Sequence, residues 1–353
     1  MPRSWHWVCP SISRMAWVST FRQSLVNVQA LVPPYQGRTM RARIPNTLEG
    51  DGIRLLLANP YGPADISILF ASINGRALSF SGQPACILGL GESLYTDTLP
   101  LNLVGGETLD VRIGFGEGVT PVSGQYGLVP FSLSRFAGAA DSPVSEFSPV
   151  VTGVCLKAVD VRTPAGSCIL AFGDSLTHLS RWPSVLGPDM PGTALLNLGI
   201  SGNQLCSTGP VDYYGPPLLQ RFLPELDGVE NIRHIFFEAG VNDFILSPQT
   251  VPQDIIDGYM QIEAWCAERN LPVTSGTLSP IGGSKHFRPD IEEKRQEVNA
   301  WIRRKSRFID YDRLLGDPDK PHCLSPAYDK GDALHMNQAG AQLVAQEVAR
   351  LLG

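Results

Sequence analysis

The pattern of hydrophobic and polar positions divides the chain into two parts of different character. Between about residues 17 and 163, short β-type runs are separated by turn residues, as in antiparallel structures. Ile73-Asn74-Gly75-Arg76 contains the Asn-Gly pair that is typical of a tight hairpin. We therefore expect an all-β sandwich with a jelly-roll-like arrangement in this part. The expected strands lie in 38–44, 52–62, 66–80, 108–115 and 154–163.

After Gly166 the pattern changes to apolar strands that alternate with helical periodicity. Apolar residues three and four apart predict one helix capped by Asp254, one capped by Asp290, and a last helix over 338–352. Alternation of strands and helices predicts an α/β fold with a parallel sheet, whose active residues gather at the carboxyl ends of the strands. The expected strands are 168–172, 194–198, 234–238, 273–277 and 308–311.

The segment Pro164-Ala165-Gly166 separates the two patterns. Proline and glycine together favour a joint between folded units. The length of 353 residues also favours two domains over one. We therefore expect an N-terminal β domain over 15–164 and an α/β domain over 165–353.

Composition and charge narrow the possible partners. Hydrophobic residues make up 43% of the chain and charged residues 18%, which is typical of a packed core and not of a disordered chain. The net charge of −6 argues against a nucleic-acid partner, and no apolar run is long enough to span a membrane. The seven cysteines form no CxxC pair and no clear signal peptide is present, so we expect reduced thiols and a cytoplasmic location. The oligomeric state stays open.

The first candidate for chemistry is a serine that directly follows the first strand of the α/β part. The chain continues from that strand as Gly173-Asp174-Ser175-Leu176. A serine at a sharp strand-to-helix turn is a suitable nucleophile, and its own N–H can face a developing oxyanion. The alternative is a serine that only caps a helix. His178 is expected on the surface of the first helical turn.

Two further strand ends carry possible oxyanion donors. Gly199 follows the second strand and can offer a backbone N–H beside the serine. Asn242 follows the third strand in the segment Gly240-Val241-Asn242-Asp243 and can donate its side-chain amide. Asp243 is expected to brace the loop. Taken one by one, these residues are equally typical of ordinary turns and helix caps.

A general base is expected just before the last helix. In Asp332-Ala333-Leu334-His335 the carboxylate can accept the Nδ1 proton of the imidazole, which leaves Nε2 free to take a proton from the serine. A second Asp-x-x-His segment, Asp319 to His322, has the same spacing but lies in a proline-rich loop. We therefore favour His335.

These four segments resemble, in the same order, the blocks of the SGNH hydrolases, also called GDSL esterases. The resemblance implies Ser175 as nucleophile and Asp332 and His335 as the rest of the triad. It also implies an oxyanion hole formed by Ser175, Gly199 and Asn242, in a flavodoxin-like three-layer fold. Met336 stands where many members have proline, which is a framework position.

The upstream β-type segments, including 54–68 and 154–177, are similar to a subset of this family that deacetylates polysaccharides. The resemblance implies a serine esterase for short acyl groups, expected to be acetyl groups on a carbohydrate. Such an esterase requires no cofactor. In the sequence, no His, Cys or Asp cluster has metal-ligand spacing. The alternatives are a lipase or acyltransferase of the same fold, or a catalytically silent carbohydrate-binding protein.

Overall fold

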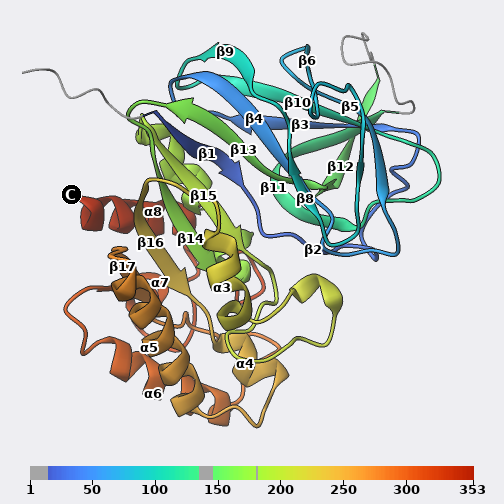
Figure 1. The fold of residues 1–353 in the computed structure, drawn as a ribbon. Helices are drawn as coiled ribbons and strands as arrows, with labels where there is room; N and C mark the ends of the chain where they lie inside the picture. Colours follow the sequence, from blue (N-terminus) through green and yellow to red (C-terminus); the bar gives the residue numbers. More distant parts are fainter. Residues whose placement is uncertain (1–14, 135–145, 180–181) are drawn as a thin grey trace, which may run out of the picture.

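The structure is a computed structural model that describes residues 15–134, 146–179 and 182–353. Figure 1 shows a strand-rich N-terminal part beside a C-terminal part in which helices cover a central sheet. The change of pattern near residue 165 therefore marks a real change of architecture.

Two antiparallel sheets make up the N-terminal part. The first has the strand order β1-β13-β4-β8, with β9 also paired to β4. Its strands are β1 (Ala16–Arg22), β4 (Gly50–Ala58), β8 (Ser93–Tyr95), β9 (Leu99–Leu103) and β13 (Leu156–Thr163).

The second sheet has the order β12-β11-β3-β10-β5-β6, with β2 paired to β11 and β7 to β5. Its strands are β2 (Val26–Asn27), β3 (Thr39–Pro45), β5 (Ile66–Ile73), β6 (Arg76–Leu78), β7 (Cys86–Leu88), β10 (Thr108–Phe115), β11 (Ser123–Ser134) and β12 (Phe147–Val154). The strand-rich character predicted for this part is confirmed, whereas the jelly-roll arrangement stays a prediction.

The predicted hairpin at Asn74-Gly75 is present. Ile73 of β5 pairs with Arg76 of β6, so two residues form the turn. Asn74 and Gly75 have φ angles of 50° and 77°. Positive φ at both turn positions matches the right-handed twist of the flanking strands, and asparagine and glycine tolerate it best.

The C-terminal part has the α/β fold that was predicted. Its sheet is parallel and has the order β15-β14-β16-β17-β18. In chain order this is 2-1-3-4-5, the flavodoxin-like order. The strands are β14 (Ser167–Gly173), β15 (Thr193–Gly199), β16 (Ile232–Glu238), β17 (Val273–Gly276) and β18 (Phe308–Ile309).

Helices cover both faces of this parallel sheet. They are α1 (Ser175–His178), α2 (Trp182–Leu186), α3 (Leu218–Leu226), α4 (Val241–Leu246), α5 (Pro252–Glu268), α6 (Pro289–Ile302), α7 (Tyr311–Leu315) and α8 (Gln338–Leu352), with short 3-10 helices η1 (Gly187–Asp189) and η2 (Asp212–Tyr214). Alternate residues of β14 enter different apolar clusters: Leu170 and Phe172 pack with α3, α5 and α6, whereas Ile169 and Ala171 pack with α2, α7 and α8.

The predicted start of two helices is wrong by a few residues. Helix α5 begins at Pro252, and Asp254 lies in its first turn, where it accepts a hydrogen bond from the Val251 N–H at 2.9 Å. Helix α6 begins at Pro289, so Asp290 also lies inside the first turn. Proline suits the first helical position because its missing N–H has no partner there, and this moved each start upstream. The last helix has the predicted bounds.

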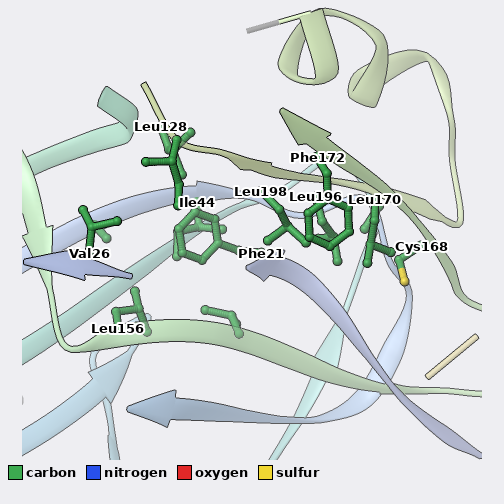
Figure 2. Packing of buried hydrophobic residues seen from close by; sticks show 14 of the residues in the cluster. Phe21, Val26, Ile44, Leu128, Leu156, Cys168, Leu170, Phe172, Leu196 and Leu198 are labelled. Carbon is green, nitrogen blue, oxygen red and sulfur yellow. The ribbon is translucent and has the colours of Figure 1, made fainter. Parts of the chain in front are cut away.

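One hydrophobic cluster joins the two parts of the chain. Figure 2 shows Phe21 of β1 and Ile44 of β3 close to Leu198 of β15, and all three belong to the same buried cluster. Phe21 is only 7% exposed and the other two are fully buried. The N-terminal strands therefore pack directly on the sheet that carries the candidate serine.

Six cysteines lie within the described residues, and all are free thiols, as predicted. Cys9 lies outside the described residues. Within those residues, no helix is long and apolar enough to cross a membrane.

Candidate active site

Ser175 is the first residue of α1, directly at the carboxyl end of β14. Asp174 caps the helix, since its Oδ1 accepts a hydrogen bond from the Leu176 N–H at 2.9 Å. Gly173 is required by space: a Cβ there would lie 2.4 Å from Thr177 Oγ1 and 2.8 Å from the Glu238 carbonyl oxygen. Ser175 is 8% exposed, so its environment restrains the side chain while the hydroxyl stays near the surface.

The structure brings Asp332 and His335 to this serine. His335 Nε2 lies 2.9 Å from Ser175 Oγ, and His335 Nδ1 lies 2.7 Å from Asp332 Oδ2. A carboxylate can only accept, so Nδ1 carries the ring proton and Nε2 accepts the proton of the serine hydroxyl. Three side chains from two distant segments thus form a continuous chain of hydrogen bonds.

The corner that holds His335 is built almost wholly from nearby residues, 329–337. Asp332 Oδ1 accepts hydrogen bonds from the backbone N–H groups of Leu334 at 3.0 Å and His335 at 2.8 Å. Ala333 adopts a φ of 56°, which turns the chain back on itself. Burial acts to raise the pKa of Asp332, but hydrogen bonds from the His335 backbone and imidazole outweigh it and lower that pKa to about 2. Asp332 is therefore ionised throughout the useful pH range.

Two further residues support this corner. Asp329 Oδ1 accepts hydrogen bonds from the N–H groups of residues 331, 332 and 333 at 2.8, 3.2 and 3.0 Å. Asn337 caps α8 by accepting from the Gly340 N–H at 3.1 Å, and its amide donates to the Asp329 carbonyl at 3.2 Å. Met336 is 3% exposed and packs with the α7 and α8 cluster, so it fills a framework position.

The second Asp-x-x-His segment is not brought to the serine. His322 is exposed, and its ring lies 5.7 Å from that of Phe287. Within the described residues no hydrogen bond joins Asp319 to His322, and the Asp319 N–H donates to Asp317 in a local turn. Of the two Asp-x-x-His segments, only the one that ends at His335 brings an imidazole within hydrogen-bond distance of Ser175.

The predicted role of Gly199 is not supported by the geometry. Its N–H donates to Asn197 Oδ1 at 3.0 Å and is therefore already used. Gly199 instead allows close packing, because a Cβ there would lie 2.6 Å from the His178 backbone nitrogen. We call residues 199–206, which begin at the last residue of β15, the oxyanion loop.

Gly202 has the free N–H that Gly199 lacks. In the described part of the chain, the Gly202 N–H donates to no other group. Its φ is 79°, which favours glycine. A Cβ would also lie 2.3 Å from the Tyr214 ring, so there is no space for a side chain. The sequence reasoning missed this residue, although it is the next glycine of the same loop.

Asn242 lies near the start of α4 and joins the two sides of the site. Its Nδ2 donates to Asp174 Oδ2 at 3.1 Å and to the Asn203 carbonyl at 3.0 Å. Both amide hydrogens therefore have partners, one beside the serine and one beside Gly202. A substrate oxyanion can gain this donor if it replaces one of these two acceptors.

Asp243 was expected to brace its own loop, and in the structure it holds the oxyanion loop. It is fully buried and accepts hydrogen bonds from the N–H groups of Leu205 at 2.6 Å and Cys206 at 2.8 Å. Burial raises the pKa of Asp243 to about 6, and these backbone hydrogen bonds oppose the rise.

A buried acidic pair lies beneath the serine. Burial raises the pKa of Asp174 to about 6 and raises that of Glu238 as well, and the Asp174 charge raises the Glu238 value further. Glu238 is 2% exposed and ends β16, next to Gly173 in the sheet. A proton kept on Glu238 limits the negative charge below the place where an oxyanion would form.

Arg221 of α3 was also missed by the sequence reasoning. It is 4% exposed and donates to the carbonyls of Leu198 at 2.8 Å and Gly173 at 3.2 Å and to Asn203 Oδ1 at 3.0 Å. Burial lowers the pKa of Arg221 to about 10. No local motif signals this role, since the groups that it holds lie 18 to 48 residues away.

No group of three or more His, Cys, Asp or Glu side chains among the described residues could hold a metal ion.

Comparison with known proteins identifies the family of the C-terminal part. Residues 171–343 match the model of the GDSL-like lipase/acylhydrolase family, and the match includes Ser175, Asn242, Asp332 and His335. This part of the chain belongs to that family, and the protein is a hydrolase that acts on esters.

Several solved structures are similar to part of this chain at low sequence identity. A GDSL-like lipase from Bacteroides thetaiotaomicron is 18% identical over 53% of this chain and 87% of its own, with a TM-score of 0.44. The carbohydrate acetylesterase Est24 from Sinorhizobium meliloti is 19% identical over 52% of this chain and 99% of its own, with a TM-score of 0.41. An aryl esterase from M. smegmatis is 19% identical over 53% and 100%, with a TM-score of 0.40. No curated protein matches the chain.

Proposed function

We propose that the protein is a serine esterase that removes short acyl groups, with acetyl groups on a carbohydrate as the preferred substrate. The observation that carries the proposal is the hydrogen-bonded chain from Ser175 Oγ through His335 to Asp332, with separations of 2.9 and 2.7 Å. In this order the groups can activate a hydroxyl without any metal or organic cofactor.

The proposed reaction has two acyl-transfer steps. Ser175 Oγ attacks the ester carbonyl while its proton passes to His335 Nε2, and a tetrahedral intermediate forms. The bond from carbon to the alcohol oxygen then breaks, and His335 returns the proton to that oxygen. Water attacks the acyl-enzyme with His335 again as base, which releases the acid and restores Ser175. Asp332 holds the imidazole in the tautomer that both steps need.

The proposed oxyanion donors are the N–H groups of Ser175 and Gly202 and the side-chain amide of Asn242. Ser175 begins a helix, so its N–H has no intrahelical partner. Gly202 takes the place first expected for Gly199, because the Gly199 N–H is already used. Asn242 contacts groups next to both of the other donors, which supports its inclusion.

The carbohydrate substrate is supported by two observations. The upstream segments resemble those of enzymes that deacetylate polysaccharides. In addition, Tyr213 and Tyr214 are partly exposed beside Gly202, with ring centroids 5.1 Å apart, and aromatic faces are suitable platforms for sugar rings. On this proposal the region over 15–164 is an accessory domain that covers the edge of the cleft, and 165–353 is the catalytic domain.

Hydrolysis of p-nitrophenyl acetate, butyrate and octanoate by the full chain tests the proposal. Ser175→Ala and His335→Ala should each lose at least about 10⁴-fold in kcat, since either change removes a group that acts in bond formation. His322→Ala is the matched control, because it removes the imidazole of the second Asp-x-x-His segment, and it should keep full activity.

The chain-length profile separates the alternatives. A preference for acetate supports a deacetylase, and acetylated oligosaccharides should then be better substrates than the artificial esters. A preference for octanoate would favour a lipase, and a transferred acyl group on an added sugar would favour an acyltransferase. A folded wild type with no turnover on any ester, and with sugar affinity unchanged in Ser175→Ala, would replace the proposal with a carbohydrate-binding protein.

A further inference from the structure

A fully buried histidine lies between the nucleophile helix and the oxyanion loop. His178 ends α1, three residues after Ser175, and is 0% exposed. The expectation that it lies on the helix surface is therefore wrong. The reason is that β11 of the N-terminal part covers it: the rings of Tyr126 and His178 are 4.8 Å apart in an edge contact.

Both ring nitrogens of His178 are used, and their partners fix the tautomer. His178 Nε2 lies 2.6 Å from the Tyr126 carbonyl oxygen, which can only accept, so Nε2 carries the hydrogen. The Ser201 backbone N–H, which can only donate, lies 3.1 Å from Nδ1. The imidazole is therefore neutral, and its Nδ1 lone pair holds the residue next to Gly202.

The Tyr126 carbonyl reaches His178 because of an irregularity in β11. The pairing of β11 with β12 shifts between Tyr126 and Phe131, so this stretch leaves the regular ladder. Gly127 has a φ of 72°, which turns the chain at the same place. Bulges of this kind redirect a strand toward a specific contact, and here the contact is with the catalytic part.

Other contacts hold the same turn of the oxyanion loop. Burial raises the pKa of Tyr126, and the nearby Ser201 side chain acts against this rise. On the far side, Asn203 donates to the carbonyls of Tyr214 and Pro216, at 2.8 Å each. Gly202 thus lies between two anchored neighbours, and the Ser201 anchor comes from His178 and Tyr126.

We propose that His178 is a positioning residue for ester hydrolysis. It accepts a hydrogen bond from the Ser201 N–H, and this bond sets the direction of the neighbouring Gly202 N–H in the oxyanion hole. The N-terminal β region, through the Tyr126 carbonyl, selects the tautomer that can do so. This inference rests on the proposed esterase function. It makes the β region a structural part of the oxyanion hole in addition to a cover for the cleft.

Two isosteric substitutions separate the two hydrogen bonds of His178. In His178→Asn the side-chain oxygen lies near the position of Nδ1, so it can still accept from the Ser201 N–H. In His178→Gln the amide nitrogen lies near the position of Nε2, so it can still donate to Tyr126 but no longer accepts from Ser201. We expect His178→Asn to keep kcat within about 3-fold and His178→Gln to lose roughly 10- to 100-fold, because a displaced oxyanion donor weakens transition-state binding. KM should change little in either variant.

His234 supplies the matched control. It is also buried, at 4% exposure, and its Nε2 bonds to Thr274 Oγ1 at 2.8 Å in the same sheet, outside the catalytic groups. His234→Asn and His234→Gln should lower thermal stability and leave kcat unchanged. If His178 had only a structural role, its two variants would have equal kcat values, as expected for the two His234 variants. That result would overturn the proposal.

Two measurements keep the outcome decisive. Each variant is assayed at a temperature at which circular dichroism shows it folded, and wild-type turnover that depends on Ser175 confirms the underlying esterase separately. If neither His178 variant folds, nitrogen-15 NMR of the wild type decides: the proposal requires a neutral ring with the hydrogen on Nε2. A ring with the hydrogen on Nδ1, or a charged ring at the pH of full activity, would overturn it.

Discussion

The corner at residues 329–337 and the oxyanion loop at 199–206 serve the same serine but are built in different ways. The corner is held by neighbours within a few positions: Asp329, Asp332 and Asn337 bond to backbone groups close in sequence. The oxyanion loop is held by side chains from distant elements: His178, Arg221 and Asp243.

This difference separates what a short motif can specify from what only the whole fold can specify. Residues 329–337 contain nearly every group that orients His335. The direction of one N–H in the oxyanion loop depends on α1, α3, α4 and a strand of the N-terminal part. We therefore expect changes in the corner to act on catalysis and on the local turn, and changes around the loop to act on catalysis and on the stability of several packed elements.

The largest effect is expected for Asp332→Asn in the corner. An amide at this position can donate to His335 Nδ1, which favours the tautomer with the hydrogen on Nε2 and removes the base. We expect kcat to fall by about 10⁴-fold with KM nearly unchanged. Steady-state kinetics on p-nitrophenyl acetate measures the loss. Asp319→Asn, in the second Asp-x-x-His segment, is the matched control and should retain full activity; equal losses in the two variants would contradict the assignment.

A smaller effect is expected for Asn242→Ala at the oxyanion loop. The change removes one proposed oxyanion donor, so kcat should fall by about 10²- to 10³-fold. It also leaves Asp174 Oδ2 and the Asn203 carbonyl without a donor, so the free energy of unfolding should fall by roughly 1–3 kcal/mol. Kinetics and urea unfolding measure the two effects. A loss of stability with unchanged kcat would limit Asn242 to a structural role.

The smallest effect concerns the pH dependence of Asp243. Its pKa is raised from 3.8 to about 6 in the fold, so the folded state holds its proton more tightly than the unfolded chain does. The stability that this proton contributes is complete below about pH 4 and is lost as pH rises to about 6, by up to about 3 kcal/mol. Asp243→Asn lacks this titration.

Urea unfolding of wild type and Asp243→Asn at pH 4, 5, 6 and 7 tests this expectation. The stability advantage of the wild type should shrink between pH 4 and 6 and then level off. An advantage that stays constant or grows with pH would show that the folded site does not favour the protonated carboxyl.

The features that the sequence predicts follow the same division between local and distant contacts. The strand ends and the corner were predictable from local periodicity and short spacing, whereas the flavodoxin-like strand order was implied by the family resemblance. Gly199 was preferred to Gly202 because both follow the same strand, and nothing local shows that Asn197 already uses the Gly199 N–H. His178 was expected on the surface because its cover, Tyr126, comes 52 residues earlier in the chain.

The pairing of β1 with β13 has a consequence for how the chain folds. Ala16 lies opposite Thr163, so the first described strand finds its partner only after almost half of the chain has been made. Contacts of such long sequence separation close slowly, because a large loop must be ordered before they form. Since β1 also packs on the sheet that carries Ser175, the same strand that completes one N-terminal sheet also covers part of the catalytic core.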